Sequence, residues 1–301
     1  MLVNMQAFED ARRAGQVTEY EVYPRQSSDV DEYQVKAESV PSVFPGDVRI
    51  LHGRKLIDFW TESKGIVWSK LPKLLTKTPQ KLFALIAGIP SSASNGADTF
   101  EFFDDFLGSS VNTSKWSVTG NGISVSGSIV TLTTSSTDTQ NRLTSLTNWS
   151  KNNGTILRAR LKTQYLGATN RGEQSFGAYI NKFIMANYNH GHSANSSKYS
   201  NNDGTEDATN IVGWTADTWK IQELKRPGLT RWTVNDANKV DHSIHYPTDD
   251  FPIWIRADYY DNPATMWVDW VLIRKYASTE PLILKKSVLG KAAMIRAVIA
   301  G

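Results

Sequence analysis

The most constraining feature of the sequence is a long series of short runs in which apolar and polar residues alternate. The runs recur at short intervals from residue 20 to residue 275, and no helix of ordinary length is expected between them. Alternation with a period of two indicates half-buried β-strands. Many such strands without intervening helices favour a sandwich or a barrel over a fold of alternating strands and helices. We therefore predict an all-β protein.

A hinge rich in Gly, Ser, Pro and Asn divides the strands into two groups at residues 88–98. The chain of 301 residues has room for about two domains, each with its own core. We predict a small β-sandwich-like domain of about six strands at residues 18–90. A larger sandwich should occupy residues 98–281.

Helix is expected only at the two ends of the chain. Residues 1–17 should form an N-terminal helix or arm with Gly15 as its stop, and residues 282–301 a basic C-terminal helix. Apolar residues recur at helical spacing from Leu284 to Ile299. We expect this helix to join copies of a homo-oligomer, because it lacks the aromatics of a membrane-surface helix. Packing against its own subunit is the alternative. Its cations are Lys285, Lys286, Lys291 and Arg296.

The composition argues against several kinds of partner, metal site and membrane attachment. The 33 basic and 30 acidic side chains are interspersed and leave a net charge of +3, so we expect no nucleic-acid partner. The sequence has no Cys, which excludes disulfides and thiolate zinc sites. No stretch approaches the roughly 18 apolar residues of a membrane span. The first residues lack the apolar run of a signal peptide.

One stretch of the sequence carries a resemblance beyond composition. It runs through GDVRILHGRKLIDFW, IVWSKLP and FALIAGIPSSASNGADTFEFFDDF. It is similar to the domain-of-unknown-function family (2341 type) that precedes concanavalin-A-like modules in archaeal, bacterial and viral surface proteins. Ile89 departs from the pattern of that family, which has Asn there. The matching positions are Asp47, Arg49, Trp60, Trp68, Lys70, Pro72, Gly88, Pro90 and Phe103–Phe106.

A second stretch, MWVDWVLIRKYASTEP, resembles the last strand of the sandwich that follows in those proteins. The matching positions are Asp269, Trp270, Arg274, Lys275, Tyr276, Glu280 and Pro281. Together the two stretches extend the resemblance over residues 18–281. The resemblance implies a concanavalin-A-like (laminin-G-like) jelly-roll sandwich of the lectin and glucanase type. It implies a display at the surface of a virion or of a cell.

Sandwiches of this type include both lectins and glycoside hydrolases, so the acidic residues must be weighed. The hydrolases place two carboxylates on one strand face, as in a Glu-x-Asp-x-x-Glu run, so that acid and nucleophile lie about 5 Å apart. The sequence has no such run, and Glu173, Asp258 and Asp269 are isolated. We therefore expect a non-catalytic structural or attachment protein with a lectin-like, glycan-binding sandwich. A hydrolase whose acids converge only in space is the alternative, and a large separation of Glu173 and Asp258 would count against it.

Candidate glycan-binding residues gather in the polar segment Asn187–Asn210. Aromatic faces suit the stacking of sugar rings, and amides and carboxylates suit sugar hydroxyls. A solvated loop without a ligand is the alternative. The candidates are Tyr188, Asn189, His190, Tyr199 and Asp203, with Trp214 and Trp219 as platforms beside a nearby turn. Four other tryptophans are expected in the core, namely Trp116, Trp232, Trp254 and Trp270.

Calcium is the candidate cofactor. Asp104 and Asp105 lie at the entry to the larger sandwich, and Asp269 lies on its last strand. Carboxylate oxygens are the ligands that calcium prefers, and the first and last strands of such sandwiches are neighbours. The alternative is that these carboxylates cap turns and accept hydrogen bonds from the backbone. His190 and His192 form a further pair without an identifiable third metal ligand.

Overall fold

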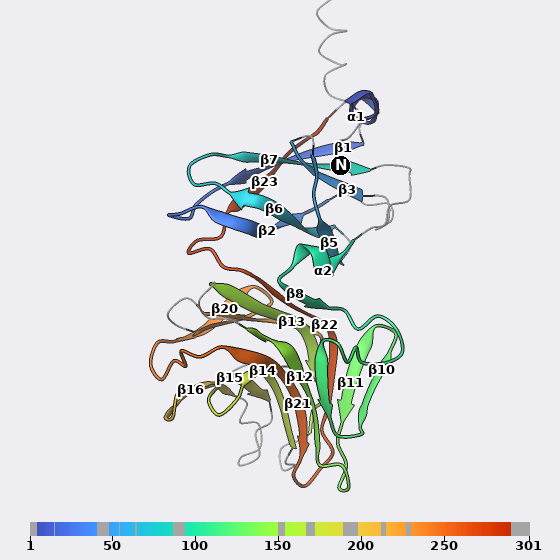
Figure 1. Cartoon of the computed structure of the whole chain (residues 1–301). Helices are drawn as coiled ribbons and strands as arrows, with labels where there is room; N and C mark the ends of the chain where they lie inside the picture. The colour runs from blue at the N-terminus through green and yellow to red at the C-terminus, as the bar shows by residue number, and fades with distance from the viewer. Residues whose placement is uncertain are drawn as a thin grey trace, which may run out of the picture. The chain divides into compact units, whose positions relative to one another are not determined.

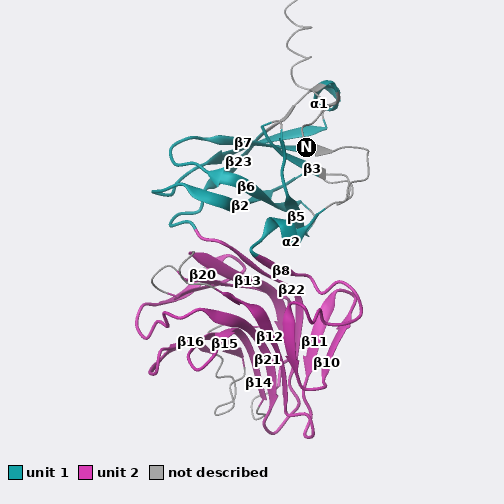
Figure 2. Cartoon of the chain, in the orientation of Figure 1, with its two compact units in different colours: residues 1–101, 277–301 teal, residues 102–276 magenta. Residues whose placement is uncertain are grey.

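A computed structural model describes residues 5–14, 16–40, 48–53, 55–63, 65–86, 94–149, 154–166, 172–188, 198–211, 215–226 and 230–289. The chain forms two compact units, unit 1 with residues 1–101 and 277–301 and unit 2 with residues 102–276 (Figure 2). Both units are built of strands, as the alternation predicts (Figure 1). The division follows Glu101 rather than the hinge at residues 88–98, and residues 277–281 belong to unit 1.

Unit 1 contains two antiparallel sheets that share one core. The first has the strand order β23-β1-β7-β3-β4 and the second the order β2-β6-β5. Alternate residues of both sheets, among them Tyr20 and Val22 from β1 and Tyr33 and Val35 from β2, form that core. The elements are α1 (Met5–Arg13), β1 (Val17–Tyr23), β2 (Val30–Glu38), β3 (Val48–His52), β4 (Lys55–Leu56), β5 (Phe59–Ser63), β6 (Ile66–Leu74), β7 (Gln80–Ile86), α2 (Gly96–Thr99) and β23 (Leu282–Leu289).

The C-terminal part of unit 1 corrects the expected basic helix. Residues 282–289 form strand β23, which pairs antiparallel with β1 along its whole length. The edge of β1 offers backbone partners, and Ile283 packs on the core. The Lys286 ammonium lies 3.0 Å from the Glu21 carboxylate and 5.0 Å from the centre of the Tyr23 ring. Residues 290–301 lie outside the described residues. At the other end, the expected N-terminal helix is α1.

Unit 2 contains two larger antiparallel sheets. The eight-stranded sheet has the order β10-β11-β22-β13-β18-β19-β20, with β8 also paired to β22, and the seven-stranded sheet has the order β17-β16-β15-β14-β21-β12-β9. The strands are β8 (Phe102–Asp104), β9 (Trp116–Thr119), β10 (Ile123–Ser126), β11 (Ile129–Thr133), β12 (Gln140–Trp149), β13 (Thr155–Thr163), β14 (Gly172–Tyr179), β15 (Phe183–Tyr188), β16 (Lys198–Asn202), β17 (Glu206–Asn210), β18 (Lys220–Lys225), β19 (Thr230–Val234), β20 (Ala237–His242), β21 (Phe251–Tyr259) and β22 (Thr265–Lys275).

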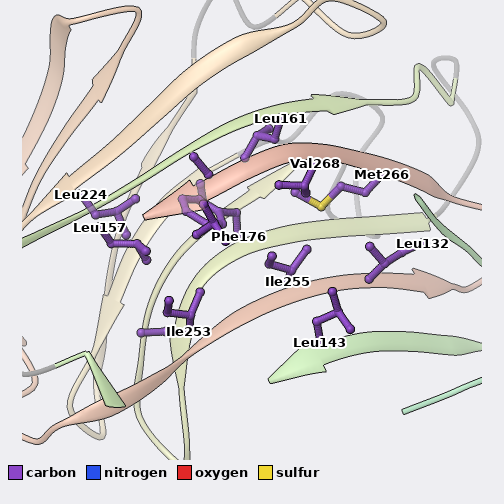
Figure 3. Packing of buried hydrophobic residues seen from close by; sticks show 14 of the residues in the cluster. Leu132, Leu143, Leu157, Leu161, Phe176, Leu224, Ile253, Ile255, Met266 and Val268 are labelled. Carbon is purple, nitrogen blue, oxygen red and sulfur yellow. The ribbon is translucent and has the colours of Figure 1, made fainter. Parts of the chain in front are cut away.

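The core of unit 2 lies between its two sheets (Figure 3). Leu157 and Leu161 of β13 belong to the same cluster as Phe176 of β14 and Ile253 and Ile255 of β21. Because successive side chains of a strand point to opposite faces, the residues between these point away from the core. The sandwich thus has two outer faces, one on each sheet. No helix in the described ranges is long and apolar enough to cross a membrane.

The four tryptophans that we expected in the core take different positions. Trp116 and Trp232 belong to the core cluster of unit 2. Trp254 and Trp270 are also buried but lie outside that cluster, next to core residues in sequence and therefore on the outer faces. Burial alone does not distinguish a core tryptophan from one on an outer face, because a side chain on an outer face can be covered by its neighbours.

Candidate functional site

The outer face of the seven-stranded sheet brings two isolated acids together. Ala257 of β21 and Phe176 of β14 face the core, so that Asp258 and Glu173 point outward. The register of the two strands places Glu173 directly opposite Asp258. Gln140 of β12 is the partner of Asp258 on the other side. Three neighbouring strands thus contribute one polar side chain each to a single row.

Hydrogen bonds tie this row into a cluster. The Ser175 hydroxyl donates to Glu173 Oε1 at 2.6 Å, and the Tyr260 hydroxyl donates to Oε2 at 3.4 Å. Gln140 Nε2 donates to Asp258 Oδ1 at 3.2 Å. The other oxygen of Asp258 forms an ion pair with Arg256, two residues before it on the same strand face. Each acid therefore has partners at both oxygens.

Burial dominates the electrostatics of the cluster. Glu173 and Asp258 are only 4% and 3% exposed. Burial raises the pKa of Asp258, the Arg256 charge opposes that rise, and the Glu173 carboxylate adds to it. Burial works against the charge of Arg256, but the carboxylates of Asp258 and Glu173 outweigh it and raise the pKa of the guanidinium. Burial also raises the pKa of the Tyr260 hydroxyl, helped by both carboxylates. Asp258 is thus the acid that holds its proton more tightly than an ordinary aspartate does.

Aromatic side chains continue the same face. The Trp254 ring stacks on Tyr179 with centroids 4.2 Å apart and an angle of 9° between the planes. Tyr179 in turn stacks on Phe183 at 6.2 Å. The guanidinium groups of Arg142 and Arg256 lie 5.2 and 5.0 Å from the centre of the Trp254 ring. Tyr179 and Phe183 are half-buried, so that this aromatic strip remains partly accessible.

Gly177 makes the close pairing beneath the strip possible. It lies opposite Trp254 on one side and Met185 on the other. A Cβ atom there would lie 2.0 Å from the carbonyl oxygen of Ile184. Real Cβ atoms do not approach a backbone oxygen so closely, so any larger residue would push β14 and β15 apart. The glycine therefore fixes the spacing of the strands that carry Tyr179 and Phe183.

Two buried polar groups extend the face towards β16. Asn187 lies opposite Ser175, and Ser200 lies opposite Met185. Asn187 Oδ1 and the Ser200 hydroxyl are buried and have no hydrogen-bond partner within the part of the chain that the structure describes. A buried polar atom without a partner is costly, and sugar hydroxyls are groups that can supply one. The face thus combines fixed acceptors, fixed donors and stacked aromatics.

The arrangement has two chemical capacities. Fixed carboxylates, amides and guanidinium groups beside aromatic rings can bind the hydroxyls and the apolar face of a sugar. Directly opposed residues of antiparallel strands have Cβ atoms about 5 Å apart, which is compatible with the spacing of roughly 5 Å between the carboxyl groups of retaining glycosidases. Against the second capacity, Ser175 and Gly177 follow Glu173 on the outward side of β14, so that this strand presents a single acid.

The structure places most of the expected glycan-binding residues elsewhere. Tyr188 and Tyr199 are strand residues inside the sandwich, which corrects their expected place in a solvated loop. The Tyr188 hydroxyl donates to Gln222 Oε1 at 2.9 Å, and Tyr199 stacks on Trp232 at 4.9 Å. Two of the expected loop positions are already strand: β15 continues to Tyr188, and β16 begins at Lys198. Both side chains are almost completely buried, so neither hydroxyl can reach a sugar from there.

The two remaining expected residues that the structure describes, Asp203 and Trp219, do not converge on one site. Asp203 is exposed and accepts a hydrogen bond from the Thr205 backbone at 3.3 Å, with His245 Nδ1 3.2 Å away. Trp219 lies beside Arg160 of β13, on the other sheet. Asn189, His190 and Trp214, together with His192, lie outside the described residues.

The three aspartates proposed for calcium have other partners. Asp104 accepts hydrogen bonds from the Trp116 indole at 2.6 Å and from the Phe106 backbone at 3.0 Å. Asp269 forms an ion pair with Arg160. Asp105 is half-buried, and burial raises the pKa of its carboxyl group. Across the described ranges, no three His, Asp or Glu side chains form a group that could hold a metal ion. The contacts of Asp104 agree with the alternative expectation that this carboxylate caps a turn, since it accepts a hydrogen bond from the Phe106 backbone.

Sequence reasoning missed most members of the outward row. In the sequence Glu173 and Asp258 are isolated acids, and only the register joins them. No sequence motif marks Arg142, Arg256 and Tyr260 as members of a site. The available signal was the alternation in β21, where Trp254, Arg256 and Asp258 share the parity opposite to Ile253 and Ile255. Strand pairing, which sequence alternation does not specify, was needed to connect them with β14.

The comparisons agree with this architecture. Residues 45–119 match the model of the family "Domain of unknown function (DUF2341)", a range that takes in β3 to β7 of unit 1 and β8 and β9 of unit 2. A search of curated proteins found no match. A glycosyl hydrolase family protein from Mycobacterium fortuitum has a similar structure, with a TM-score of 0.50 and 16% identity, and the similarity covers 58% of this chain and 99% of that one.

Two further solved structures are similar over the same share of the chain. A glycosyl hydrolase family 16 protein from Mycobacterium smegmatis has a TM-score of 0.49 and 15% identity, and 99% of it is covered. The β-glucanase of Bacillus licheniformis has a TM-score of 0.46 and 16% identity, and 98% of it is covered. The chain therefore joins a segment of the DUF2341 family at residues 45–119 to a concanavalin-A-like sandwich with the fold found in glycosyl hydrolases.

Proposed function

We propose that unit 2 binds a glycan on the outer face of the seven-stranded sheet and does not cleave it. The observation that carries this proposal is the buried Glu173–Asp258 row, fixed by protein hydrogen bonds beside the stack of Trp254, Tyr179 and Phe183. Polar groups that are already held in place lose little conformational entropy when a ligand binds. The name of the similar glycosyl hydrolase supports polysaccharides as the first ligands to test.

The way in which the acids are held supports binding without cleavage. Both oxygens of Asp258 already have partners, Gln140 and Arg256, and its side chain is almost completely buried. A general acid must reach the glycosidic oxygen within hydrogen-bond distance, and a nucleophile must reach the anomeric carbon. The half-buried rings of Tyr179 and Phe183 are the groups of this face that a glycan can contact directly, and the acid row beneath them keeps the face in shape.

Binding and cleavage can be separated in one set of assays. Affinity electrophoresis with laminarin, alginate and agar measures binding, and the release of reducing ends measures cleavage. Tyr179→Ala should weaken retention of the bound polysaccharide at least roughly fivefold, because a stacked aromatic contributes about 1 kcal/mol beyond its buried area. Glu206→Gln, on the outlying strand β17, is the control and should leave retention unchanged. Equal retention of all three proteins would contradict the proposed face.

Hydrolysis by Glu173 and Asp258 is the second candidate function, and a specific observation favours it. The two acids lie opposite each other instead of far apart, and burial gives Asp258 the raised pKa of a general acid. If reducing ends appear, Glu173→Gln should abolish them while binding persists. Release of reducing ends that depends on Glu173 would replace the binding proposal by this one.

We further propose that the chain displays this face as an attachment protein at the surface of a virion or a cell appendage, as a homo-oligomer. The match to the DUF2341 family supports this role, through the surface proteins that the resemblance implies. Binding of the labelled protein to whole host cells, and its competition by the polysaccharide that binds best, test attachment. Light scattering tests the oligomer. A monomer that binds no host cell would contradict both parts.

A further inference from the structure

A second group of aromatic and charged side chains lies on the outer face of the eight-stranded sheet, on the other side of the sandwich from Glu173 and Asp258. Ala159 and Leu161 of β13 belong to the core, so that Arg160 and Lys162 point outward. Trp267 of β22 points outward for the same reason, since its neighbours Met266 and Val268 belong to the core. The register places Lys162 directly opposite Trp267.

These side chains form one continuous layer, which we call the cation–aromatic patch and define as Arg160, Lys162, Trp219 and Trp267. The Lys162 ammonium lies between two indoles, 4.1 Å from the centre of the Trp267 ring and 5.5 Å from that of Trp219. The Arg160 guanidinium lies 4.7 Å from the centre of the Trp219 ring. All four side chains are partly exposed. The patch therefore presents indole surface and positive charge together.

The charges of the patch are not balanced. Arg160 pairs with Asp269, the acid once expected to bind calcium. Lys162 has no carboxylate within 4 Å in the described part of the chain, and its ammonium contacts the two rings. An indole face attracts a cation but accepts no conventional hydrogen bond from it. The ammonium therefore keeps donors for an incoming anion.

Hydroxyl groups extend the patch along the same face. Thr131 of β11 lies opposite Trp267, and Ser124 of β10 lies opposite Thr131. Both point outward, because Val130, Leu132 and Val125 around them belong to the core. The row from Ser124 to Lys162 thus offers hydroxyl, hydroxyl, indole and ammonium groups in sequence across four neighbouring strands.

We propose that the cation–aromatic patch binds an acidic polysaccharide. A pyranose ring would pack on the indoles, its carboxylate or sulfate group would accept hydrogen bonds from Lys162, and its hydroxyls would meet Thr131 and Ser124. Charge complementarity favours this ligand over a neutral glycan. Two cations, one of them paired with Asp269, are too few to follow a nucleic-acid backbone, which needs a series of phosphate contacts. The patch is separate from the proposed glycan face and does not depend on it.

Titration calorimetry of the full chain with polygalacturonate, dextran sulfate, neutral dextran and a single-stranded oligonucleotide tests the proposal. Lys162→Met keeps the apolar stem between the indoles and removes the charge. It should weaken binding of the acidic polysaccharide at least roughly tenfold, the effect of losing a hydrogen bond to a charged group. Lys239→Met, on the exposed part of β20 at the far edge of the sheet, is the control of equal charge and should bind as the wild type does.

Two further variants complete the test. Trp219→Ala should weaken binding of both acidic polymers, whereas Glu206→Gln on β17 of the opposite sheet should not. Polygalacturonate and dextran sulfate distinguish uronate from sulfate recognition. Equal affinity for neutral dextran, equal losses in Lys162→Met and Lys239→Met, or tighter binding of the oligonucleotide would each overturn the proposal. Unchanged thermal unfolding of each variant ensures that a loss of binding is not a loss of fold.

Discussion

Glu223 is a buried carboxylate surrounded by cations on the outer side of β18. It is 3% exposed, and its Oε2 lies 3.2 Å from both Arg158 and Arg274. Its other oxygen lies 3.2 Å from the Lys225 ammonium. Burial opposes the ionisation of Glu223, but Arg274 and Arg158 outweigh it and lower its pKa from 4.5 to about 2. The folded state therefore holds this acid ionised far into the acidic range.

This lowered pKa predicts a specific dependence of stability on pH. The contribution of the ionised Glu223 to the free energy of unfolding is fully present above pH 4.5 and is lost as the pH falls towards 2. Glu223→Gln should lower the free energy of unfolding by about 3 to 5 kcal/mol near neutral pH, because two buried guanidinium groups lose their carboxylate. Urea unfolding at falling pH should show the difference between the two proteins shrinking in acid.

A matched substitution controls for the loss of an ordinary surface charge. Glu206→Gln removes the partner of Lys198 on the partly exposed β17, and such pairs contribute about 1 kcal/mol or less. Its effect should be small at every pH. A Glu223→Gln difference that stays constant from neutral pH to acid would show that Glu223 is not the group that titrates.

The same parity that turns Glu223 outward explains which single residues the sequence could identify. Alternation in β21 separates Ile253 and Ile255 from Trp254 and Asp258, and this much is visible in the sequence. The partner of Asp258 cannot be identified from the sequence, because Glu173 lies 85 residues earlier and only the hydrogen-bonded register joins the two. The expected loop position of Tyr188 is wrong for a related reason. A tyrosine at the end of a strand resembles a loop residue in the sequence, and only the structure shows that it points inward.

At the scale of elements, β23 shows that apolar spacing alone does not distinguish a helix from a strand. The spacing of Leu284, Val288 and Leu289 suits a helix, but a short apolar run is compatible with either period. The choice is made by β1, whose free edge accepts residues 282–289 as an antiparallel partner. Ile283 then packs on the core while Leu284 remains 39% exposed. A strand such as β21 is easier to predict, because its apolar and polar residues alternate over 9 residues.

The pairing of β23 with β1 predicts different outcomes for two truncations. Deletion of residues 282–301 removes β23 and leaves the edge of β1 without backbone partners, whereas deletion of residues 290–301 leaves the pair intact. Hydrogen exchange followed by mass spectrometry should show faster exchange in β1 after the longer deletion only, since lost ladder bonds expose its amides. Unchanged exchange after both deletions would mean that β23 does not protect β1. Light scattering of the same two proteins tests the proposed role of this end in oligomer formation.

At the scale of the whole molecule, the sequence indicated two domains but not their interleaved order. The hinge and the change in strand pattern predict a boundary at residues 88–98, and the first crossing between the units follows Glu101. The second crossing, after Tyr276, falls inside the continuous stretch that resembles the end of the sandwich. Nothing in the composition changes there. Ala277 nevertheless packs in the core of unit 1, and the Tyr33 hydroxyl donates to the Glu280 carboxylate.

This order predicts which part of the chain folds by itself. Unit 2 is continuous from residue 102 to residue 276, and its first strand β8 pairs with its last strand β22, from Phe102 opposite Ile273 to Asp104 opposite Val271. Its two ends therefore lie on neighbouring strands, so cutting it out breaks no strand and leaves a closed sandwich. Residues 102–276 alone should unfold cooperatively in urea and retain polysaccharide binding.

Unit 1 provides the matching comparison, because it needs two separate parts of the chain. Residues 1–101 alone lack β23, Ala277 and Glu280, so this fragment should exchange its β1 amides rapidly. A version in which a short Gly-Ser linker joins residue 101 to residue 277 should restore slow exchange, since the two ends of the excised sandwich are close. Rapid exchange in the joined version, or an unfolded 102–276 fragment, would show that each unit depends on the other for its fold. Slow exchange together with a folded fragment would establish unit 2 as an insertion into unit 1.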